Sequence, residues 1–347
     1  MELKTPVTLM DSATTNEPSG NGSVPLVQVR DLTKTFVLGK SLVRQLLGKP
    51  PAYLRALDSV NLDISRGEAL GLVGESGCGK TTLGRCILRL YEPDRGQVLY
   101  EGQDILKMKG AAMRQMRSRM QIVFQDPYSS LNPKQTIREI LAEPCLVHKL
   151  CAPKKVGERV DYLLNMVGLS TEVAERYPHE LSGGQRQRVG LARALAVEPK
   201  FIVADEPVSA LDVSIQAQVI NLLMELQEKL HLTLLFITHD LRLVHYVSHR
   251  VAVMYLGSIV ELASAEELFA HPAHPYTRAL LAAAPKIDPR QRVIAPPAIR
   301  GEPPSPINIP AGCRFRLRCP LASERCTVED PPLRVWDKVH FVACHNV

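Results

Sequence analysis

Short apolar runs bounded by polar residues recur along the chain and are separated by longer amphipathic segments. The continuous runs, which are typical of buried strands, lie at 69–73, 121–124, 201–204 and 232–237. The run at 60–64 alternates between apolar and polar residues, as many strands do. The stretches at 82–90 and 186–197 carry apolar residues at helical spacing. This pattern predicts an α/β fold.

A glycine-rich segment joins the run at 69–73 to the helical stretch at 82–90. Its residues match G-x-x-x-x-G-K-[ST]: Gly74, Glu75, Ser76, Gly77, Cys78, Gly79, Lys80 and Thr81. The glycines let backbone N–H groups face an anion, and the helix N-terminus adds the positive end of its dipole. We expect Lys80 to reach the β- and γ-phosphates and the Thr81 hydroxyl to ligate Mg²⁺. A strand, this loop and a helix together predict a site for a nucleoside triphosphate.

A second glycine turn precedes the helical stretch at 186–197. It consists of Leu181, Ser182, Gly183, Gly184 and Gln185. A glycine turn at a helix N-terminus is again suited to an anion. One triphosphate does not need two such sites in one chain. The second turn therefore suggests a site for a nucleotide held mainly by another subunit.

Polar residues follow the buried runs where an attacking water and a metal ion are expected. Asp205 suits the Mg²⁺ shell through a water, and Glu206 suits a base that polarises the attacking water. Gln125, at the end of another run, is expected to face Mg²⁺ or a water. His239 is expected to contact the γ-phosphate and the water. Each residue alone would fit a strand end equally well, so these assignments depend on one another and on the phosphate loop.

Composition divides the chain into parts. Residues 1–25 are rich in Thr, Ser, Asn, Gly and Pro, which predicts a disordered leader. The α/β part follows at 26–268, and the helical periodicity of 136–168 predicts a helical insertion within it. The basic segment at 39–55 contains two adjacent prolines and looks like an inserted surface loop. Residues 269–347 form a small C-terminal extension.

The overall composition favours a globular protein. Of the 347 residues, 45% are hydrophobic and 22% are charged, as in ordinary soluble domains. No apolar stretch approaches the ~20 residues that span a bilayer, and no signal peptide is evident at the N-terminus. We therefore expect a cytosolic protein, free or bound to something. The net charge of +6 is mild and dispersed, which favours a solvated surface over a nucleic-acid site.

In their order along the chain, these motifs resemble those of the ATP-binding cassette (ABC) ATPases. The matching residues are the phosphate loop at 74–81, Gln125 as the Q-loop glutamine, the signature motif at 181–185, Asp205 with Glu206, Asp212 at the end of the D-loop, and His239 as the switch histidine. Phe36 lies where the family places its adenine-stacking aromatic residue, although packing in the core is the alternative. Thr82 follows Thr81 where the family more often has Ser-Thr.

The resemblance implies a RecA-like core with an antiparallel β edge and a helical subdomain at about 126–180. Two such domains meet head to tail, so each ATP lies between the phosphate loop of one subunit and the signature motif of the other. ATP closes the dimer, and hydrolysis and release open it, which drives transmembrane partners.

The tail carries a narrower resemblance, to the ATPases of dipeptide/oligopeptide and nickel importers. The matching segments are 274–281, 284–285, 312–315, 318–320, 331–333 and 342–345 together with Cys326. The segments at 125–128 and 130–133 are similar to the F-type member of the ATPase pair in such importers. The implied function is ATP-powered import of dipeptides or oligopeptides. Import of nickel, glutathione or another small solute is the alternative.

The same resemblance implies the partners. They are a second, D-type ATPase subunit, two transmembrane permease subunits and a separate substrate-binding protein. The chain would lie on the cytoplasmic face of the inner membrane, with the segment at 128–131 against the transmembrane helices. An ABC ATPase acting on nucleic acid is less favoured, because the chain has one set of motifs and no sustained heptad run.

The chain contains eight cysteines, and its tail holds Cys313, Cys319, Cys326 and Cys344 with the spacing C-x5-C-x6-C-x17-C. Four thiolates can bind zinc or an iron–sulfur cluster. Tight C-x2–4-C pairs, typical of zinc sites, are absent, and Cys319-Pro320 is similar to the end of a ferredoxin ligand run. The family resemblance also points to a [4Fe–4S] cluster. Zinc, His340 or His345 as ligands, and reduced thiols that only pack the extension are the alternatives.

Overall fold

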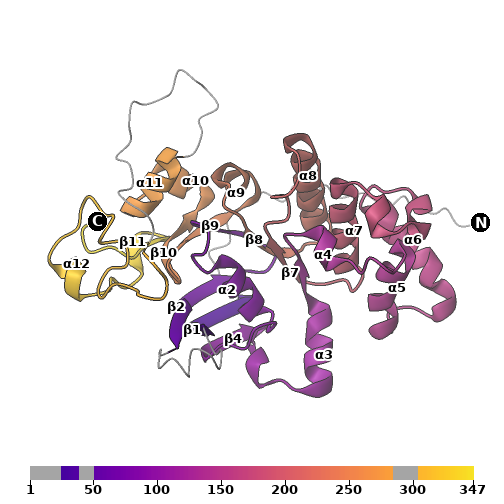
Figure 1. Cartoon of the computed structure of the whole chain (residues 1–347), viewed down its shortest axis with the longest axis horizontal. Helices are drawn as coiled ribbons and strands as arrows, with labels where there is room; N and C mark the ends of the chain where they lie inside the picture. The colour runs from indigo at the N-terminus through magenta and orange to yellow at the C-terminus, as the bar shows by residue number, and fades with distance from the viewer. Residues whose placement is uncertain (1–24, 39–50, 284–303) are drawn as a thin grey trace, which may run out of the picture.

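The computed structural model describes residues 25–38, 51–283 and 304–347 (Figure 1). The predicted leader at 1–25 lies outside the described residues except for its last residue, and so does most of the segment at 39–55. The predicted α/β fold is confirmed. No helix among the described residues is long and apolar enough to cross a membrane.

The larger sheet has eight strands in the order β11-β12-β10-β9-β3-β8-β7-β6. They are β3 (Ala69–Val73), β6 (Met120–Val123), β7 (Phe201–Asp205), β8 (Thr233–Ile237), β9 (Arg250–Tyr255), β10 (Ser258–Ser264), β11 (Arg334–Asp337) and β12 (His340–Val342). The five strands from β9 to β6 run parallel, and β10, β12 and β11 continue the sheet in antiparallel fashion. Every residue of β3, β7 and β8 is buried, which explains their continuous apolar sequences.

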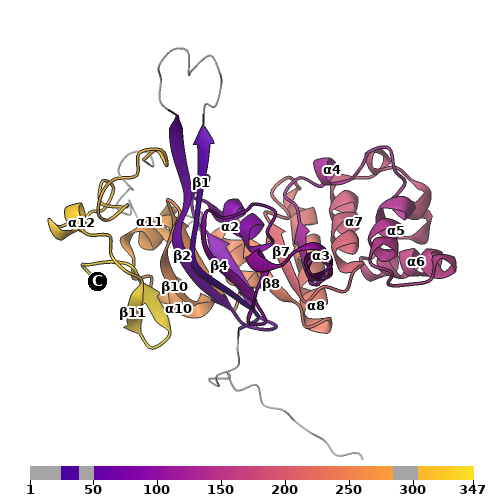
Figure 2. The same cartoon turned by 90° about the horizontal axis from the view of Figure 1, so that it is seen from below.

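The smaller sheet is antiparallel and has the order β2-β1-β4-β5. Its strands are β1 (Val27–Leu38), β2 (Ala52–Ile64), β4 (Arg95–Tyr100) and β5 (Gln103–Asp104). Figure 2 shows β1 and β2 projecting together beyond the rest of the molecule. The prediction of a surface loop at 39–55 is therefore wrong for residues 52–55, which pair with β1 as part of β2. These four residues form a strand because β1 supplies their hydrogen-bond partners, and local composition does not reveal that pairing.

The described residues form α-helices between the strands and in the C-terminal extension. They are α2 (Lys80–Ile87), α3 (Gly110–Arg119), α4 (Pro127–Ser130), α5 (Ile137–Val147), α6 (Val156–Met166), α7 (Gly183–Leu195), α8 (Val213–Lys229), α9 (Leu241–Val247), α10 (Ala265–Ala270), α11 (Pro275–Ala283) and α12 (Arg325–Val328), with short 3-10 turns at Ile105–Lys107, Pro153–Lys155, Thr171–Glu175 and Pro178–Glu180. Helices α5, α6 and α7 pack on one another at one end of the molecule (Figures 1 and 2). A capping box of Thr136 and Glu139 begins α5.

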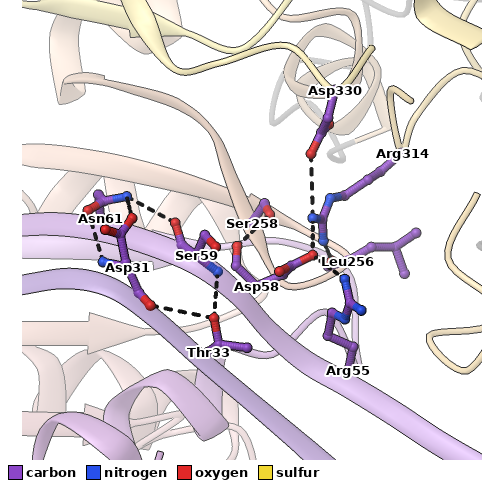
Figure 3. A network of polar contacts seen from close by, with 10 residues as sticks. All are labelled: Asp31, Thr33, Arg55, Asp58, Ser59, Asn61, Leu256, Ser258, Arg314 and Asp330. Atoms are coloured by element: carbon purple, nitrogen blue, oxygen red, sulfur yellow. Dashed lines mark hydrogen bonds and ion pairs between the residues drawn. The ribbon is translucent and has the colours of Figure 1, made fainter. Parts of the chain in front are cut away.

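The C-terminal extension lies at the opposite end and is built into the larger sheet (Figure 1). Strand β12 pairs with β10, so the extension continues the sheet. Buried Arg314 donates to the Leu256 carbonyl and to the Asp58 carboxylate of β2, both at 2.6 Å, and also pairs with Asp330 (Figure 3). Burial would raise the pKa of Asp58, but hydrogen bonds from Arg55 and Arg314 hold it below its usual value. The extension therefore continues the larger sheet through β12 and forms an ion pair with β2 of the smaller sheet.

Helix α2 approaches the larger sheet closely at Gly84. A Cβ atom there would lie 2.8 Å from Cγ1 of Val203 and 3.0 Å from Cδ1 of Ile237. We expect Gly84→Ala to overpack this contact. Gly190→Ala on α7 is the matched control, because beyond its chain neighbours and its own helix backbone no atom of the described residues lies within 4 Å of the added Cβ atom. The gain in helix propensity is similar at both positions, so Gly84→Ala should be about 1–3 kcal/mol less stable than Gly190→Ala in denaturant unfolding. Equal stabilities would show that α2 moves away from the sheet without cost.

Candidate functional site

The phosphate loop lies between β3 and α2 and is enclosed by backbone from both sheets. Gly74 and Gly79 have φ values of +153° and +111°. A Cβ atom would lie 2.2 Å from the Met254 carbonyl oxygen at Gly74 and 2.3 Å from the Ala56 carbonyl oxygen at Gly79. Only glycine fits these contacts without a backbone shift. Ser76 and Gly77 at the tip of the loop are exposed to solvent.

Lys80 is buried, and its ammonium group lies within the curve of the loop. Its Nζ donates to the carbonyl oxygens of Gly74 at 2.8 Å and Glu75 at 3.0 Å. Cys78 is buried beside it, and burial raises the pKa of the Cys78 thiol. The loop thus holds one positive charge at its centre, where a phosphate group would be attracted.

Thr81 and Asp205 form the part of the site that suits Mg²⁺. The Thr81 hydroxyl donates to Oδ1 of Asp205 at 2.8 Å. Burial is the main cause that raises the pKa of Asp205, while the Thr81 hydrogen bond and Arg85 oppose the shift. A hydroxyl and a carboxylate are oxygen ligands that Mg²⁺ prefers, so the residues present fit this metal ion.

Three of the predicted residues meet at the Glu206 carboxylate. Nε2 of Gln125 donates to Oε2 of Glu206 at 2.9 Å, and Nδ1 of His239 lies 3.4 Å from the same oxygen. They come together because Gln125, Glu206 and His239 follow β6, β7 and β8, whose carboxyl ends share one edge of the sheet. Glu206 has φ +46°, and its N–H donates to the Ile237 carbonyl of the neighbouring strand. The structure thus brings together the residues for which a role around the attacking water was predicted.

The signature segment begins α7. Ser182 is the N-cap: its hydroxyl accepts from the Gln185 N–H, and the Gln185 side chain accepts from the Ser182 N–H at 3.0 Å. Behind Ser182, Gly184 allows close packing, since a Cβ atom would lie 2.5 Å from Cγ2 of Ile215. Figures 1 and 2 show α7 beside α5 and α6 and away from α2. The second glycine turn is therefore separate from this chain's own phosphate loop.

Phe36 is half-buried on β1 and lies outside the main core. Its ring meets that of Tyr91 edge to face with 5.6 Å between centroids, and Nζ of Lys34 lies 5.4 Å from its centroid. Thr82, next to the loop, is also partly exposed. Stacking of Phe36 on adenine stays a prediction.

Two residues of the extension contact the phosphate loop, and sequence analysis assigned a role to neither of them. Arg318 forms two hydrogen bonds with the Glu75 carboxylate, and the Tyr276 hydroxyl accepts from the Glu75 N–H at 2.8 Å. Arg318 and Glu75 are 243 residues apart in sequence. No local sequence pattern predicts a contact between residues so far apart.

The structure does not support the predicted iron–sulfur cluster or its zinc alternative. Among the described residues, which include all four tail cysteines, no group of three or more His, Cys, Asp or Glu side chains is arranged to hold a metal ion. Burial raises the pKa of Cys313 to about 11 and also raises those of Cys319 and Cys344, whereas at Cys326 hydrogen bonds from Ser323 and Asn346 outweigh burial and lower the pKa. The side chains pack and accept hydrogen bonds instead, for example Cys344 from the Asn346 N–H.

The two histidines considered as alternative ligands have other partners. His340 is buried, and its Nε2 lies 2.7 Å from Oε1 of Glu261. Nε2 of His345 lies 3.1 Å from the Glu329 carbonyl oxygen. Nε2 of each ring is therefore engaged, whereas the buried Nδ1 of His340 has no hydrogen-bond partner among the described residues.

Comparison with known proteins matches both parts of the chain. A family model described as "ABC transporter" matches residues 57–209, and one described as "Oligopeptide/dipeptide transporter, C-terminal region" matches residues 260–326. A protein named putative peptide import ATP-binding protein, from Brucella ovis, is 52% identical over 320 residues, which are 92% of this chain and 97% of that protein. The oligopeptide transport ATP-binding protein AppF of Bacillus subtilis is 49% identical over 326 residues, with the same coverage of 92% and 97%.

A solved structure extends the comparison to the fold. The ATP-binding cassette MJ0796, described as a dimer in a post-hydrolysis state bound to ADP and Pi, has a TM-score of 0.60 and 29% identity. The match covers 69% of this chain and 98% of that chain. Both resemblances inferred from the motifs are confirmed. The chain belongs to the ATP-binding cassette family of transporter ATPases and carries the C-terminal region of the oligopeptide/dipeptide transporters.

Proposed function

We propose that this ABC ATPase powers the import of dipeptides or oligopeptides. The observation that carries the proposal is the C-terminal region, which matches the oligopeptide/dipeptide family model at residues 260–326. Relatives about half identical over 92% of the chain are named for peptide import or oligopeptide transport. Nickel, glutathione or another small solute is the alternative cargo, because other subunits of such an importer select the solute.

The geometry supports ATP hydrolysis with the predicted division of roles. Lys80 and the N–H groups of the loop would bind the phosphates, and Thr81 with Asp205 would hold Mg²⁺, which neutralises charge on the transferred phosphoryl group. Glu206 is the proposed base that accepts a proton from the attacking water. Gln125 and His239, both beside its Oε2, would orient that carboxylate and the water.

We also propose that the chain works in a head-to-tail pair with a D-type ATPase subunit. Support comes from the signature turn, which lies away from this chain's own phosphate loop, and from the relative MJ0796, which is described as a dimer. The segments 125–128 and 130–133 suggest the F-type role for this chain.

The contact with two permease subunits would run through the segment at 128–131. Tyr128 is exposed, with the Arg186 guanidinium 5.3 Å from its ring centroid, and it lies three residues from Gln125. A displacement of this segment by a permease subunit would thus be transmitted to Gln125, which donates a hydrogen bond to Glu206. The chain would be peripheral on the cytoplasmic face of the inner membrane, and a substrate-binding protein would deliver the peptide.

Deletion of the gene for this chain in its host tests which solute the transporter imports. We expect the deletion to abolish uptake of a labelled tripeptide and the wild-type gene to restore it. Uptake of labelled nickel and glutathione should be unchanged in the same cells. Intact tripeptide uptake together with a loss of nickel or glutathione uptake would reject peptide import in favour of that solute.

The substitution Glu206→Gln tests the base. It should lower ATP hydrolysis by the assembled transporter by about 100-fold or more, because the amide cannot accept the proton. The dissociation constant for Mg-ATP should stay within about threefold of wild type, since Lys80 and Thr81 are untouched. Glu225→Gln, an exposed residue of α8, is the control and should leave hydrolysis unchanged. Near-normal hydrolysis by Glu206→Gln would assign the base to another group.

The substitution Ser182→Asn tests the head-to-tail arrangement. Asn keeps an N-cap acceptor, so α7 should lose little stability. We expect the isolated full-length chain to bind Mg-ATP as the wild type does, while hydrolysis by the assembled pair falls, because the altered side chain would face the partner's nucleotide. Weaker binding of Mg-ATP by the isolated variant would contradict the arrangement.

A further inference from the structure

Glu75 connects the phosphate loop to the C-terminal extension through three hydrogen bonds. Nη1 and Nη2 of Arg318 donate to its two carboxylate oxygens at 2.8 and 2.9 Å. The N–H of Glu75 donates to the hydroxyl of Tyr276 on α11 at 2.8 Å. Both partners belong to the extension, whereas Glu75 is the second residue of the loop. The extension therefore contacts the nucleotide site directly.

Packing fixes the position of Arg318. The residue is 7% exposed, and its N–H donates to the Phe315 carbonyl in a tight turn. Its guanidinium carbon lies 5.9 Å from the ring centroids of both Tyr255 and Phe315. Those rings and that of Tyr276 form one cluster with centroids 4.6 to 5.5 Å apart. A bidentate pair held this way differs from an exposed ion pair, which contributes little.

Two cations approach Glu75 at different atoms. Lys80 donates a hydrogen bond to the backbone carbonyl oxygen of Glu75, and Arg318 donates to the side-chain carboxylate. Without Arg318, the carboxylate would carry an uncompensated charge beside the loop. It would then repel an incoming triphosphate, and it would compete with that triphosphate for the Lys80 ammonium group.

We propose that Arg318 is a positioning residue of the nucleotide site: it neutralises Glu75 and holds its carboxylate on the side of the extension, which reserves Lys80 for the phosphates. The inference rests on the proposed role of the loop as the ATP site. It makes the C-terminal extension a determinant of nucleotide affinity.

The test compares Mg-ATP dissociation constants of full-length variants at low ionic strength. Arg318→Ala should bind about tenfold more weakly, the effect of one extra negative charge roughly 6 Å from Mg-ATP, whose net charge is about −2, in water. The double variant Glu75→Gln/Arg318→Ala should return to within about threefold of wild type, because no charge is then left unpaired. The loss in Arg318→Ala should shrink in high salt, which screens that repulsion.

The matched control is Arg314→Ala. Arg314 is a buried arginine of the same extension, but it pairs with Asp58 of β2 and with Asp330 (Figure 3). Its loss should lower the melting temperature and leave Mg-ATP affinity within about twofold, since the partners of Arg314 are Asp58, Asp330 and the Leu256 carbonyl and not a residue of the loop. An equal loss of affinity in Arg314→Ala would mean that any damage to the extension weakens binding, and would overturn the proposal.

The remaining outcomes separate this inference from the proposed function. A folded wild-type chain that fails to bind Mg-ATP would contradict the ATP site itself. If the wild type binds, then unchanged affinity in Arg318→Ala, or no recovery in the double variant, overturns the role of Arg318 alone. Should Arg318→Ala not fold, Glu75→Gln decides: binding at least as tight as wild type supports the proposal, and weaker binding overturns it.

Discussion

The close approach of the phosphate loop to the backbone of β2 and β9 is the constraint on which the site depends. Carbonyl oxygens of Met254 and Ala56 occupy the space that side chains at Gly74 and Gly79 would need. Because the two oxygens come from different sheets, the loop has its shape only when both sheets are packed together. The loop in turn fixes the start of α2, and with it the positions of Lys80 and Thr81. A local sequence motif therefore functions through long-range packing.

The second half of the site arises from topology. Three parallel strands end at one edge and deliver Gln125, Glu206 and His239 to a common point. The same edge is linked to the surface, because Gln125 leads within three residues to exposed Tyr128. Because Gln125 donates to Glu206 at 2.9 Å, a displacement of that segment would act on this hydrogen bond. This offers a physical route by which the proposed membrane contact and the proposed base Glu206 would influence each other.

Much of the site was predictable because its chemistry is encoded in contiguous residues. Continuous apolar runs located β3, β7 and β8, and the polar residues after them marked the shared edge. Long-range contacts were not predictable. The pairing of residues 52–55 with β1 and the contact of Arg318 with Glu75 depend on partners outside the local sequence. Cysteine spacing in particular does not fix the direction in which each sulfur points, and no arrangement that would hold a metal ion is found among the described residues.

The extension also changes how the nucleotide-binding part should be delimited. Its strand β12 continues the larger sheet through β10, Arg314 pairs with β2, and Arg318 pairs with the phosphate loop. Removing residues 269–347 would expose the edge of β10, leave the Glu75 carboxylate without Arg318, and uncover Tyr255, which is buried against Phe315. Unpaired charges and exposed aromatic rings at the loop would distort the site more than they would the distant helices. The predicted boundary at 268 therefore marks the end of the family's motifs, whereas the phosphate loop packs against residues on both sides of that boundary.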